Sequence, residues 1–492
     1  MSDFSLLTAD LGGSSLRVAL LDHQARPLRL ASHPVETHQP GPGYAEQRPE
    51  DWWRLFRDLS AEVLAGTRPA ALAITGMTRS QVLVDSAGHA LYPAILWRDA
   101  RAVAEAEELA SQADPRYGPF GPYHPLARLL WLARYESTVL GATAHVLQPK
   151  DYLAMRLTGV AGSDWVSSQP FLEPDGSAPA RALFQALKLS VRLVPPLHSP
   201  GARLGVIRER LDPPWRELAG VPVHVVPMDT WCCTVGIGAC QAGQAYTISG
   251  TSEVTGVLTS QRAGAEGLVG LPWGRDLWHL GGPSQAGADC LEWLAGVLDD
   301  GDQRSGRDLL AELEALPAVG DPPLFLPYLA GERTPFWDPT LRGVLFGLER
   351  QHQRAALVQA LVEGVAFHSR RVLELAEQAT GPASGPLRIG GGATRSPRWC
   401  QTRADVLGRA VLGTDAEEAG LAGAGLTLLH GLGHYPDLAA AQQALVGEAR
   451  LFQPDPGRAS RYQGLYELHR KLHRQLQPLF GELAHWRGVA DP

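Results

Sequence analysis

Residues 6–18 read LLTADLGGSSLRV, the pattern of a buried strand, a turn of glycines and serines, and a second strand. Residues 245–257 read AYTISGTSEVTGV and repeat that order of strand, glycine–hydroxyl turn and strand. The two turns are separated by close to half of the 492-residue chain. We therefore expect two similar domains, residues 1–244 and 245–492, that face each other across a central cleft, where ligands preferentially bind.

The rest of the chain alternates between helical and strand patterns, which predicts an α/β fold. Residues 51–65 carry apolar side chains at helical spacing, and residues 70–74 form the continuous apolar run of a buried strand. A later helix is expected over residues 397–412. Apolar residues make up 45% of the chain and charged residues 20%, which is typical of a folded globular protein.

Charge and cysteine content argue against several classes of protein. The net charge of -8 gives no basic surface for nucleic acid. The longest uncharged stretch, residues 230–252, contains four glycines and two glutamines and is too polar for a membrane helix. The five cysteines are odd in number and absent from the first 231 residues, so they form no disulfide framework. Because no signal peptide is recognisable either, we expect a cytoplasmic protein.

A phosphate-binding device other than the lysine-containing loop is predicted near the N-terminus. The chain has only three lysines, and none precedes serine or threonine, so G-x-x-x-x-G-K-[ST] is absent. In the turn Gly12, Gly13, Ser14 and Ser15, glycine lets backbone N–H groups point into one concavity, and the serines add hydroxyl donors. Asp10 ends the preceding strand, where a carboxylate can hold hydrated Mg²⁺ beside phosphates. An ordinary hairpin turn is the alternative.

Two further glycine-containing segments lie in the second half of the chain. One is the turn of the 245–257 stretch, which could hold the same phosphate chain from its other side. The other follows a short strand at residues 387–389 and permits a flat group such as adenine to lie against the backbone. Their residues are Gly250, Thr251, Ser252, Gly391, Gly392 and Ala393. Arg395 replaces the last glycine of the dinucleotide pattern G-x-G-x-x-G, which disfavours a redox Rossmann domain.

Asp229 is the candidate general base. It follows an apolar strand at residues 223–226 and opens the next helix. An acid at the C-terminal end of a strand is well placed to accept a proton from a substrate hydroxyl. The alternative is a helix N-cap, a frequent role of aspartate.

Ordered motifs run along almost the whole chain. They are GYAEQ at residues 43–47, PAILWRDAR at 93–101, YHPLARLLWL at 123–132, LPYLAGERTP at 326–335 and the segment 343–363. Together they resemble the motifs of the FGGY family of carbohydrate kinases, most of all its xylulokinase branch. Arg128 stands where that family usually has lysine, and Ala356 where it usually has a polar residue. The resemblance implies the actin, hexokinase and Hsp70-type fold, with two similar ribonuclease H-like domains.

The resemblance also implies an activity: ATP-dependent phosphorylation of a small sugar, with D-xylulose as the leading candidate, and with Mg²⁺ and ATP held between the domains. Asp10 would position the metal, and Asp229 would take the proton of the sugar hydroxyl. The first phosphate loop would run from Gly12 to Ser15 with Arg17, the second would be the turn at 250–252, and residues 391–393 would face the adenosine. The residues implied for the sugar are Thr78, Arg79, Trp97, Asp99, Asp229 and Trp231. Core packing for Trp97 and a surface salt bridge for Asp99 are the alternatives.

Departures from the family pattern leave the substrate open. The segment 77–80 reads MTRS, where xylulokinases usually have Gln-Met-His-Gly. Arg79 is permanently charged and could bind ketose hydroxyls, pair with the carboxylate of a sugar acid, or form a salt bridge. Trp231 stands where a small residue is common and could narrow the pocket, stack on the sugar or belong to the core. Another ketose, a polyol such as glycerol or erythritol, or a sugar acid is therefore an alternative substrate.

Two rival functions use the same fold. A non-catalytic sugar sensor would keep the clefts but lose the base or a phosphate loop, and all of these are present. A chaperone- or filament-type ATPase would not need the segment 97–101 or Asp229. Beyond a small-molecule sugar, the sequence implies no nucleic acid or membrane partner. Homodimers are common in the family, although no stretch of this sequence requires one.

Overall fold

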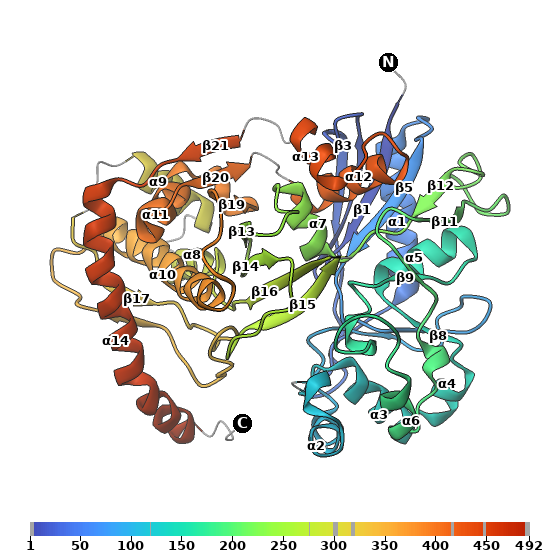
Figure 1. Cartoon of the computed structure of the whole chain (residues 1–492), viewed down its shortest axis with the longest axis horizontal. Coiled ribbons are helices and arrows are strands. Elements are labelled where there is room, and N and C mark those ends of the chain that lie inside the picture. Colours follow the sequence, from blue (N-terminus) through green and yellow to red (C-terminus); the bar gives the residue numbers. More distant parts are fainter. Residues whose placement is uncertain are drawn as a thin grey trace. The chain divides into compact units, whose positions relative to one another are not determined.

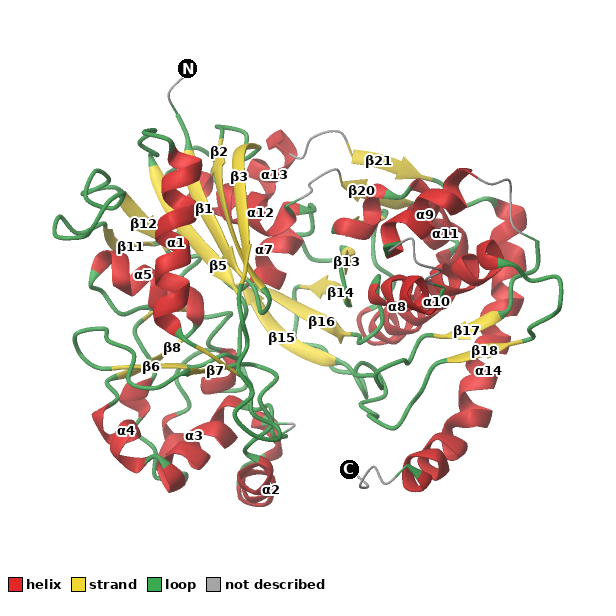
Figure 2. Ribbon diagram, turned by 180° about the vertical axis from the view of Figure 1, so that it is seen from behind, coloured by secondary structure: helices red, strands yellow, loops and turns green. Residues whose placement is uncertain are grey.

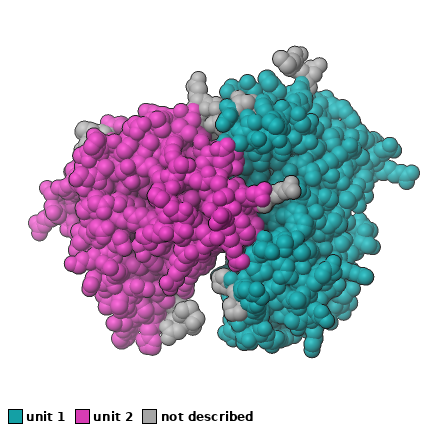
Figure 3. All heavy atoms as spheres, viewed as in Figure 1, with its two compact units in different colours: residues 1–236, 420–445 teal, residues 237–419, 446–492 magenta. Residues whose placement is uncertain are grey.

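The computed structural model describes residues 4–118, 120–274, 276–298, 304–315, 320–414, 418–445 and 449–487. The chain forms two compact units (Figure 3). Unit 1 comprises Met1–Gly236 and Gly420–Leu445, and unit 2 comprises Ile237–Ala419 and Val446–Pro492. The first division thus lies just before the expected boundary at residue 244, and a late segment of the chain belongs to the first unit. The binding roles expected of the two domains stay predictions.

Unit 1 is built on a six-stranded sheet in the order β11-β12-β5-β1-β2-β3 (Figure 2). The strands are β1 (Leu6–Leu11), β2 (Ser15–Leu21), β3 (Pro27–Pro34), β5 (Ala71–Gly76), β11 (Arg203–Val206) and β12 (Pro222–His224). β1 and β2 form the antiparallel hairpin that the sequence predicts, and β5 runs parallel to β1 and to β12. The carboxyl ends of these parallel strands therefore meet at one edge of the sheet.

Amphipathic helices cover this sheet. In α1 (Pro49–Leu64), Pro49 and two acidic residues occupy the first turn, where a fixed φ and negative charge favour a helix start. The buried face of α1 includes Trp52 and Phe56 and packs on β2 and β3. The other helices of this part are α5 (Pro149–Thr158), α7 (Asp229–Gly236), α12 (Ala419–Gly431) and α13 (Leu438–Leu445).

A second core lies within unit 1 around short strands and helices. The helices are α2 (Val103–Gln112), α3 (Pro125–Tyr135), α4 (Ser137–Ala142) and α6 (Arg181–Ala186). The strands are β4 (Glu46–Gln47), β6 (Val82–Val84), β7 (Ala94–Ile95), β8 (His145–Leu147), β9 (Ser163–Asp164) and β10 (Leu197–His198). This core supports the segments after β5 and β7 that carry the residues expected to contact sugar.

Unit 2 repeats the topology of unit 1 (Figure 1). Its sheet has the order β15-β16-β14-β13-β19-β20-β21. The strands are β13 (Ala245–Ser249), β14 (Glu253–Thr259), β15 (Val269–Gly274), β16 (Leu277–Pro283), β19 (Leu387–Gly390), β20 (Val411–Thr414) and β21 (Ala449–Phe452). β13 and β14 form an antiparallel hairpin, and β13, β19 and β20 run parallel, as β1, β5 and β12 do. The predicted α/β fold with two similar halves is confirmed.

The remaining elements of unit 2 are mostly helical. They are α8 (Asp289–Val297), α9 (Gly306–Ala315), α10 (Arg354–Thr380), α11 (Pro397–Leu407), α14 (Pro456–Trp486), and the strands β17 (Leu324–Leu326) and β18 (Val344–Phe346). The helix expected over 397–412 is wrong at its end. Gly408 adopts the left-handed conformation (φ 58°) that terminates helices, and β20 begins three residues later. Over the described residues, none of the helices has the length and apolarity to cross a bilayer.

Candidate functional site

The turn between β1 and β2 is held by its own backbone and by one buried glutamine. Gly12 N donates to Ser15 O at 3.0 Å, and Gln47 Nε2 donates to Gly13 O at 2.9 Å. Gln47 is fully buried, and its Oε1 accepts a hydrogen bond from Trp52 Nε1. Within the described part of the chain, the amides of Gly13 and Ser14 donate no hydrogen bond. These two amides can donate to an anion, and the phosphate-binding role of the turn stays a prediction.

Asp10 lies beside this turn on β1. In the β1–β2 register it is opposite Arg17, so their side chains lie on the same face of the hairpin. Gly420, at the start of α12, approaches the carboxylate so closely that a Cβ there would be 3.2 Å from Asp10 Oδ2 and 3.4 Å from Cys233 Sγ. No sequence pattern near Gly420 indicates this contact, because it joins residues at opposite ends of the chain. A side chain at position 420 would therefore crowd the Asp10 carboxylate.

The residues around Asp10 fit Mg²⁺ better than a metal ion whose ligands all come from the protein. Over the described residues, no three His, Cys, Asp or Glu side chains gather to hold a metal ion. Mg²⁺ usually keeps several waters and is bound by one or two carboxylates and by phosphate oxygens. A single carboxylate beside a turn with available amides satisfies that requirement.

Asp229 is the first residue of α7. Its Oδ1 accepts the N–H of Thr230 at 2.5 Å and the Thr230 hydroxyl at 3.1 Å, while Oδ2 accepts no hydrogen bond from any residue that the structure describes. Burial raises the pKa of the Asp229 carboxyl, and the hydrogen bonds from Thr230 oppose that rise. Thr75, on β5, holds the preceding segment by donating to Pro227 O at 2.7 Å. Asp229 thus offers one oxygen with a raised proton affinity, as a general base requires.

Arg79 and Trp97 lie in two loops that meet near the first turn. The Trp97 amide donates to Ser80 Oγ at 3.0 Å, and a Cβ on Gly13 would be 3.5 Å from Trp97 Nε1. Trp97 is 39% exposed, so it is not a core aromatic residue. Arg79 adopts φ +57°, a conformation that L side chains rarely adopt. The structure therefore places Trp97 close to the predicted phosphate turn, and the loop that contains Arg79 contacts the loop that contains Trp97.

Thr78 and Trp231 are less accessible to solvent than Trp97. The Thr78 hydroxyl is 3.4 Å from Ser167 O, at the long limit of a hydrogen bond. Trp231 is buried on α7, with 4% of its surface exposed, which favours the core alternative over stacking on a ligand.

Asp99 has a different environment from the one expected. Its side chain is fully buried, and its two oxygens accept hydrogen bonds from Ala45 N at 2.6 Å and from the Arg101 guanidinium at 2.7 and 2.8 Å. Arg101 also binds Glu46 and lies over the Tyr44 ring. These contacts argue against direct sugar binding by Asp99, because both oxygens are committed. The salt-bridge alternative describes its contacts, although the pair is buried rather than on the surface.

The turn between β13 and β14 in unit 2 matches the first turn. Gly250 N donates to Ser252 O at 3.1 Å, and the amides of Thr251 and Ser252 donate no hydrogen bond within the described residues. Gly391 adopts φ +115°, and a Cβ there would be 2.3 Å from Ser249 O. Only glycine fits this position, which places the third glycine cluster against the end of β13. Next to it, Gly392 is exposed and a Cβ there would meet no atom within 4 Å, whereas Ala393 is buried.

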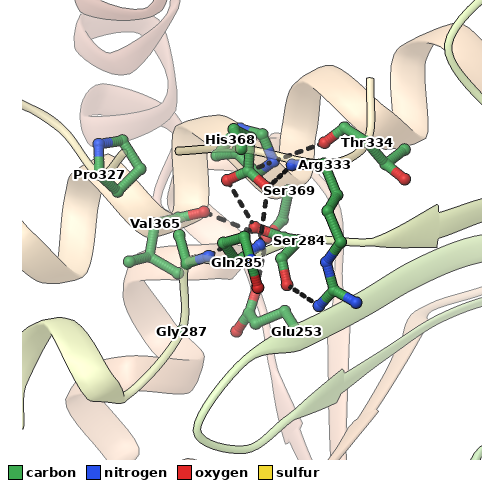
Figure 4. Close-up of polar contacts among 12 residues, drawn as sticks. Glu253, Ser284, Gln285, Gly287, Pro327, Arg333, Thr334, Val365, His368 and Ser369 are labelled. Carbon is green, nitrogen blue, oxygen red and sulfur yellow. Dashed lines mark hydrogen bonds and ion pairs between the residues drawn. The ribbon is translucent and has the colours of Figure 1, made fainter. Parts of the chain in front are cut away.

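A buried ion pair between Arg403 and Glu253 holds the β13–β14 turn in place. Arg403 donates to Glu253 Oε1 and, at 3.0 Å, to Ser369 Oγ. The Glu253 carboxylate also accepts the hydroxyl of Ser249 at 2.6 Å. It accepts the hydroxyl of Ser369 at 2.5 Å (Figure 4). Ser249 and Glu253 flank the turn, so this network fixes both of its ends. Sequence reasoning missed it, because its members come from β13, β14, α10 and α11.

A second buried carboxylate holds the segment that supports the same turn. Glu332 accepts hydrogen bonds from Ser284 Oγ at 2.9 Å and Gln285 N at 2.6 Å. Arg333 donates to Ser284 O at 2.7 Å (Figure 4). Three residues after Gln285, the N-cap residue of α8 binds the turn, since Ala288 N donates to Gly250 O at 3.0 Å. Residues 331–335 (GERTP) therefore help to position the β13–β14 turn in unit 2.

Comparison with known proteins identifies both units. The N-terminal domain model of the FGGY family of carbohydrate kinases matches residues 5–236, and its C-terminal domain model matches residues 245–431. The chain is 30% identical over 489 residues to the xylulose kinase of Escherichia coli, covering 96% of this chain and 99% of that protein. It is 28% identical over 508 residues to the glycerol kinase of Citrifermentans bemidjiense, covering 94% and 96%.

A solved structure agrees with these sequence matches. The crystal structure of xylulose kinase from Rhodospirillum rubrum superimposes with a TM-score of 0.82 at 28% identity, covering 97% of this chain and all of that one. The two ranges that the family models match contain both glycine–hydroxyl turns and the segment around Asp229. The chain therefore belongs to the FGGY family of carbohydrate kinases.

Proposed function

We propose that this carbohydrate kinase transfers the γ-phosphoryl group of ATP to D-xylulose, forming D-xylulose 5-phosphate, with Asp229 as the general base. The observation that carries the proposal is the carboxylate of Asp229, whose Oδ2 accepts no hydrogen bond from the described residues and whose proton affinity is raised by burial. It lies in the same unit as the first turn and the loops of Arg79 and Trp97. The xylulose kinases among its relatives support the choice of sugar.

The contacts described above support one role for each residue of the proposed site. ATP supplies the phosphoryl group, and Mg²⁺ neutralises charge that develops during transfer. Asp10 would hold the metal, and the amides of each glycine–hydroxyl turn would bind phosphate oxygens. Arg79 and Trp97 orient the sugar, and Asp229 Oδ2 takes the proton as the hydroxyl attacks. Such a reaction depends mainly on positioning and charge stabilisation.

The test is sugar-dependent release of ADP by the purified protein with Mg²⁺-ATP. The panel contains D-xylulose, L-xylulose, ribulose, glycerol, erythritol and sugar acids. Turnover highest with D-xylulose supports the proposal, whereas turnover only with a polyol or an acid keeps the mechanism and changes the substrate. No turnover with any sugar, while ATP still binds, would favour a non-catalytic sensor.

A second candidate substrate class is favoured by one specific observation. The segment 77–80 carries a permanently charged arginine, and the glycerol kinase relative matches the chain at an identity close to that of the xylulose kinases. A polyol phosphorylated at a terminal hydroxyl would use the same base and the same turns. The ratio of kcat/KM for D-xylulose to that for glycerol separates the two candidates.

Replacing Arg79 by histidine is expected to shift the order of kcat/KM across the sugar panel. Loss of a charged donor to sugar hydroxyls changes individual kcat/KM values by about tenfold to a hundredfold. Arg98 provides the control, because it is an exposed arginine whose guanidinium donates to Thr37 Oγ1 and lies next to Trp97 in sequence. An unchanged profile for Arg79→His, equal to that of Arg98→His, would show that Arg79 has only a structural role.

Replacing Gly420 by valine is expected to lower kcat by about a hundredfold, because side chain atoms would displace the Asp10 carboxylate. The measurement is kcat with saturating sugar and ATP, together with the dependence of the rate on Mg²⁺ concentration. Gly464→Val in α14 is the matched control, since a Cβ at that helical glycine meets no atom within 4 Å. If Gly420→Val kept the kcat and Mg²⁺ dependence of the wild type, a side chain at position 420 would not disturb the function of Asp10, which would contradict the prediction.

A further inference from the structure

Arg128 on α3 is an arginine in an unusual environment. Its side chain is fully buried, and no carboxylate among the described residues lies within ion-pair distance of its guanidinium. Burial lowers the pKa of Arg128 to about 9; the negative charge of Asp99, which lies beyond ion-pair distance, opposes this shift, and the positive charge of Arg79 adds to it. A buried charge without an acidic partner is costly unless hydrogen bonds to dipoles compensate it.

Backbone carbonyl groups provide that compensation. The guanidinium donates through Nη1 to Leu96 O, and through Nη2 to Arg79 O and, at 3.3 Å, to Tyr123 O. Leu96 directly precedes Trp97, and Tyr123 lies just before the start of α3. One side chain therefore joins the loop after β5, the loop after β7 and the segment leading into α3.

The bond to Arg79 has a conformational consequence. Arg79 has φ +57°, which costs free energy for any residue with a Cβ. Donation from Arg128 to the Arg79 carbonyl stabilises this backbone conformation and so fixes the direction in which the Arg79 side chain leaves the loop. The second loop is fixed in the same way, because the Leu96 carbonyl belongs to the peptide group that ends at Trp97 N, which donates to Ser80 Oγ.

We propose that Arg128 is a positioning residue that holds the Arg79 and Trp97 loops together and thereby sets the affinity and selectivity of the enzyme for its sugar. The proposal rests on the proposed function, because it assigns sugar contacts to Arg79 and Trp97. In this role Arg128 contacts neither the sugar nor the nucleotide. Arginine suits this role, since its planar fork serves acceptors in different directions, whereas lysine presents one point charge.

The experiment measures KM for sugar, KM for ATP and kcat in Arg128→Met, Arg128→Lys, Arg79→Met and the Arg79→Met/Arg128→Met double variant. For Arg128→Met we expect the sugar KM to rise about tenfold to a hundredfold while the ATP KM changes less than about twofold. Arg128→Lys should lie between Arg128→Met and the wild type, as partial rescue. The double variant should raise the sugar KM by less than the product of the single effects, because Arg128 acts through Arg79.

The control is Arg134→Met on the same helix. Arg134 is partly exposed and binds Glu105 and Glu108 at 2.6 and 2.7 Å, so it tests whether loss of any arginine from α3 has the same effect. Thermal unfolding of every variant accompanies the kinetics. We expect Arg134→Met to keep both KM values.

Three results would overturn the proposal. They are an unchanged sugar KM in folded Arg128→Met, fully multiplicative effects in the double variant, and equal increases in the sugar and ATP KM values. Should Arg128→Met fail to fold, folded Arg128→Lys with a wild-type sugar KM and panel profile would overturn it as well. Absence of wild-type turnover with every sugar would refute the proposed function itself and this inference with it, whereas wild-type turnover with unaffected variants refutes only the role of Arg128.

Discussion

Asp229→Asn is expected to lower kcat for sugar phosphorylation by about a hundredfold to ten-thousandfold, the range associated with loss of a general base. Asparagine keeps the size of the side chain and a carbonyl oxygen for the Thr230 N–H, but it cannot take a proton from the hydroxyl. ATP binding should remain close to that of the wild type, because the groups assigned to phosphate are elsewhere. Single-turnover kinetics and titration with a fluorescent ADP analogue measure the two quantities.

Asp437→Asn separates a catalytic role from a helix-capping role. Asp437 precedes α13 in the same unit and accepts the Ala440 N–H at 2.7 Å, as capping aspartates do. It is expected to leave kcat unchanged. If Asp229→Asn lowered kcat no more than Asp437→Asn, the base would have to be sought elsewhere.

The pH dependence of the wild type belongs to the same prediction. Only the ionised carboxylate can accept the proton, so kcat/KM should fall as pH decreases through the pKa of Asp229. Because burial raises that pKa, the acid limb should lie at a higher pH than the value of about 3.9 for an ordinary aspartate. The residual activity of Asp229→Asn should lack this limb.

Arg403→Met is expected to destabilise unit 2 by about 3–5 kcal/mol, because it leaves the Glu253 carboxylate buried without its cationic partner. Ser249 and Ser369 alone cannot offset a buried negative charge. The turn at Gly250–Ser252 loses its anchor at the same time, so KM for ATP should rise even where the protein remains folded. Denaturant unfolding and KM for ATP are the measurements.

Two companion variants make this prediction specific. Arg409→Met breaks a half-buried pair with Glu377 at 2.7 Å and should cost no more than about 1 kcal/mol. The double variant Arg403→Met/Glu253→Leu removes both charges and should recover most of the stability, though not the affinity for ATP. Equal losses of stability in Arg403→Met and Arg409→Met would contradict the assigned role of the buried pair.

The parts of the fold and site that could be predicted from sequence are local ones. Each glycine–hydroxyl turn lies between two apolar strands that are adjacent in the chain, so residues 6–18 and 245–257 reveal the hairpins directly. Asp229 was placed correctly at the start of a helix, because a strand pattern ends just before it. Likewise Gly391 follows a short strand in both the sequence pattern and the structure.

The parts that could not be predicted depend on contacts between distant residues. Glu253 and Arg403 meet from β14 and α11, and nothing near either residue in the sequence indicates the other. Gly420 has the same property toward Asp10. For Asp99 the family resemblance implied a contact with the sugar, but only the structure shows that Ala45 and Arg101 occupy its oxygens. Pattern and spacing carry no information on which polar groups a buried carboxylate will find.

Gly420–Leu445 belongs to unit 1 but follows most of unit 2 in the chain. During synthesis, unit 1 therefore cannot be completed until most of unit 2 has been made. When the ribosome has made residue 236, the first sheet is complete, but α12 and α13 are still missing from its covering layer. In the folded unit, Gly423 packs so tightly on α7 that a Cβ there would be 1.8 Å from Cys232 O, and Gly425 lies against Leu21 and Ala25. These surfaces stay exposed to water until most of unit 2 has been translated. Expression of residues 1–236 alone should therefore yield an aggregation-prone fragment, and co-expression with a peptide of residues 418–445 should restore its solubility.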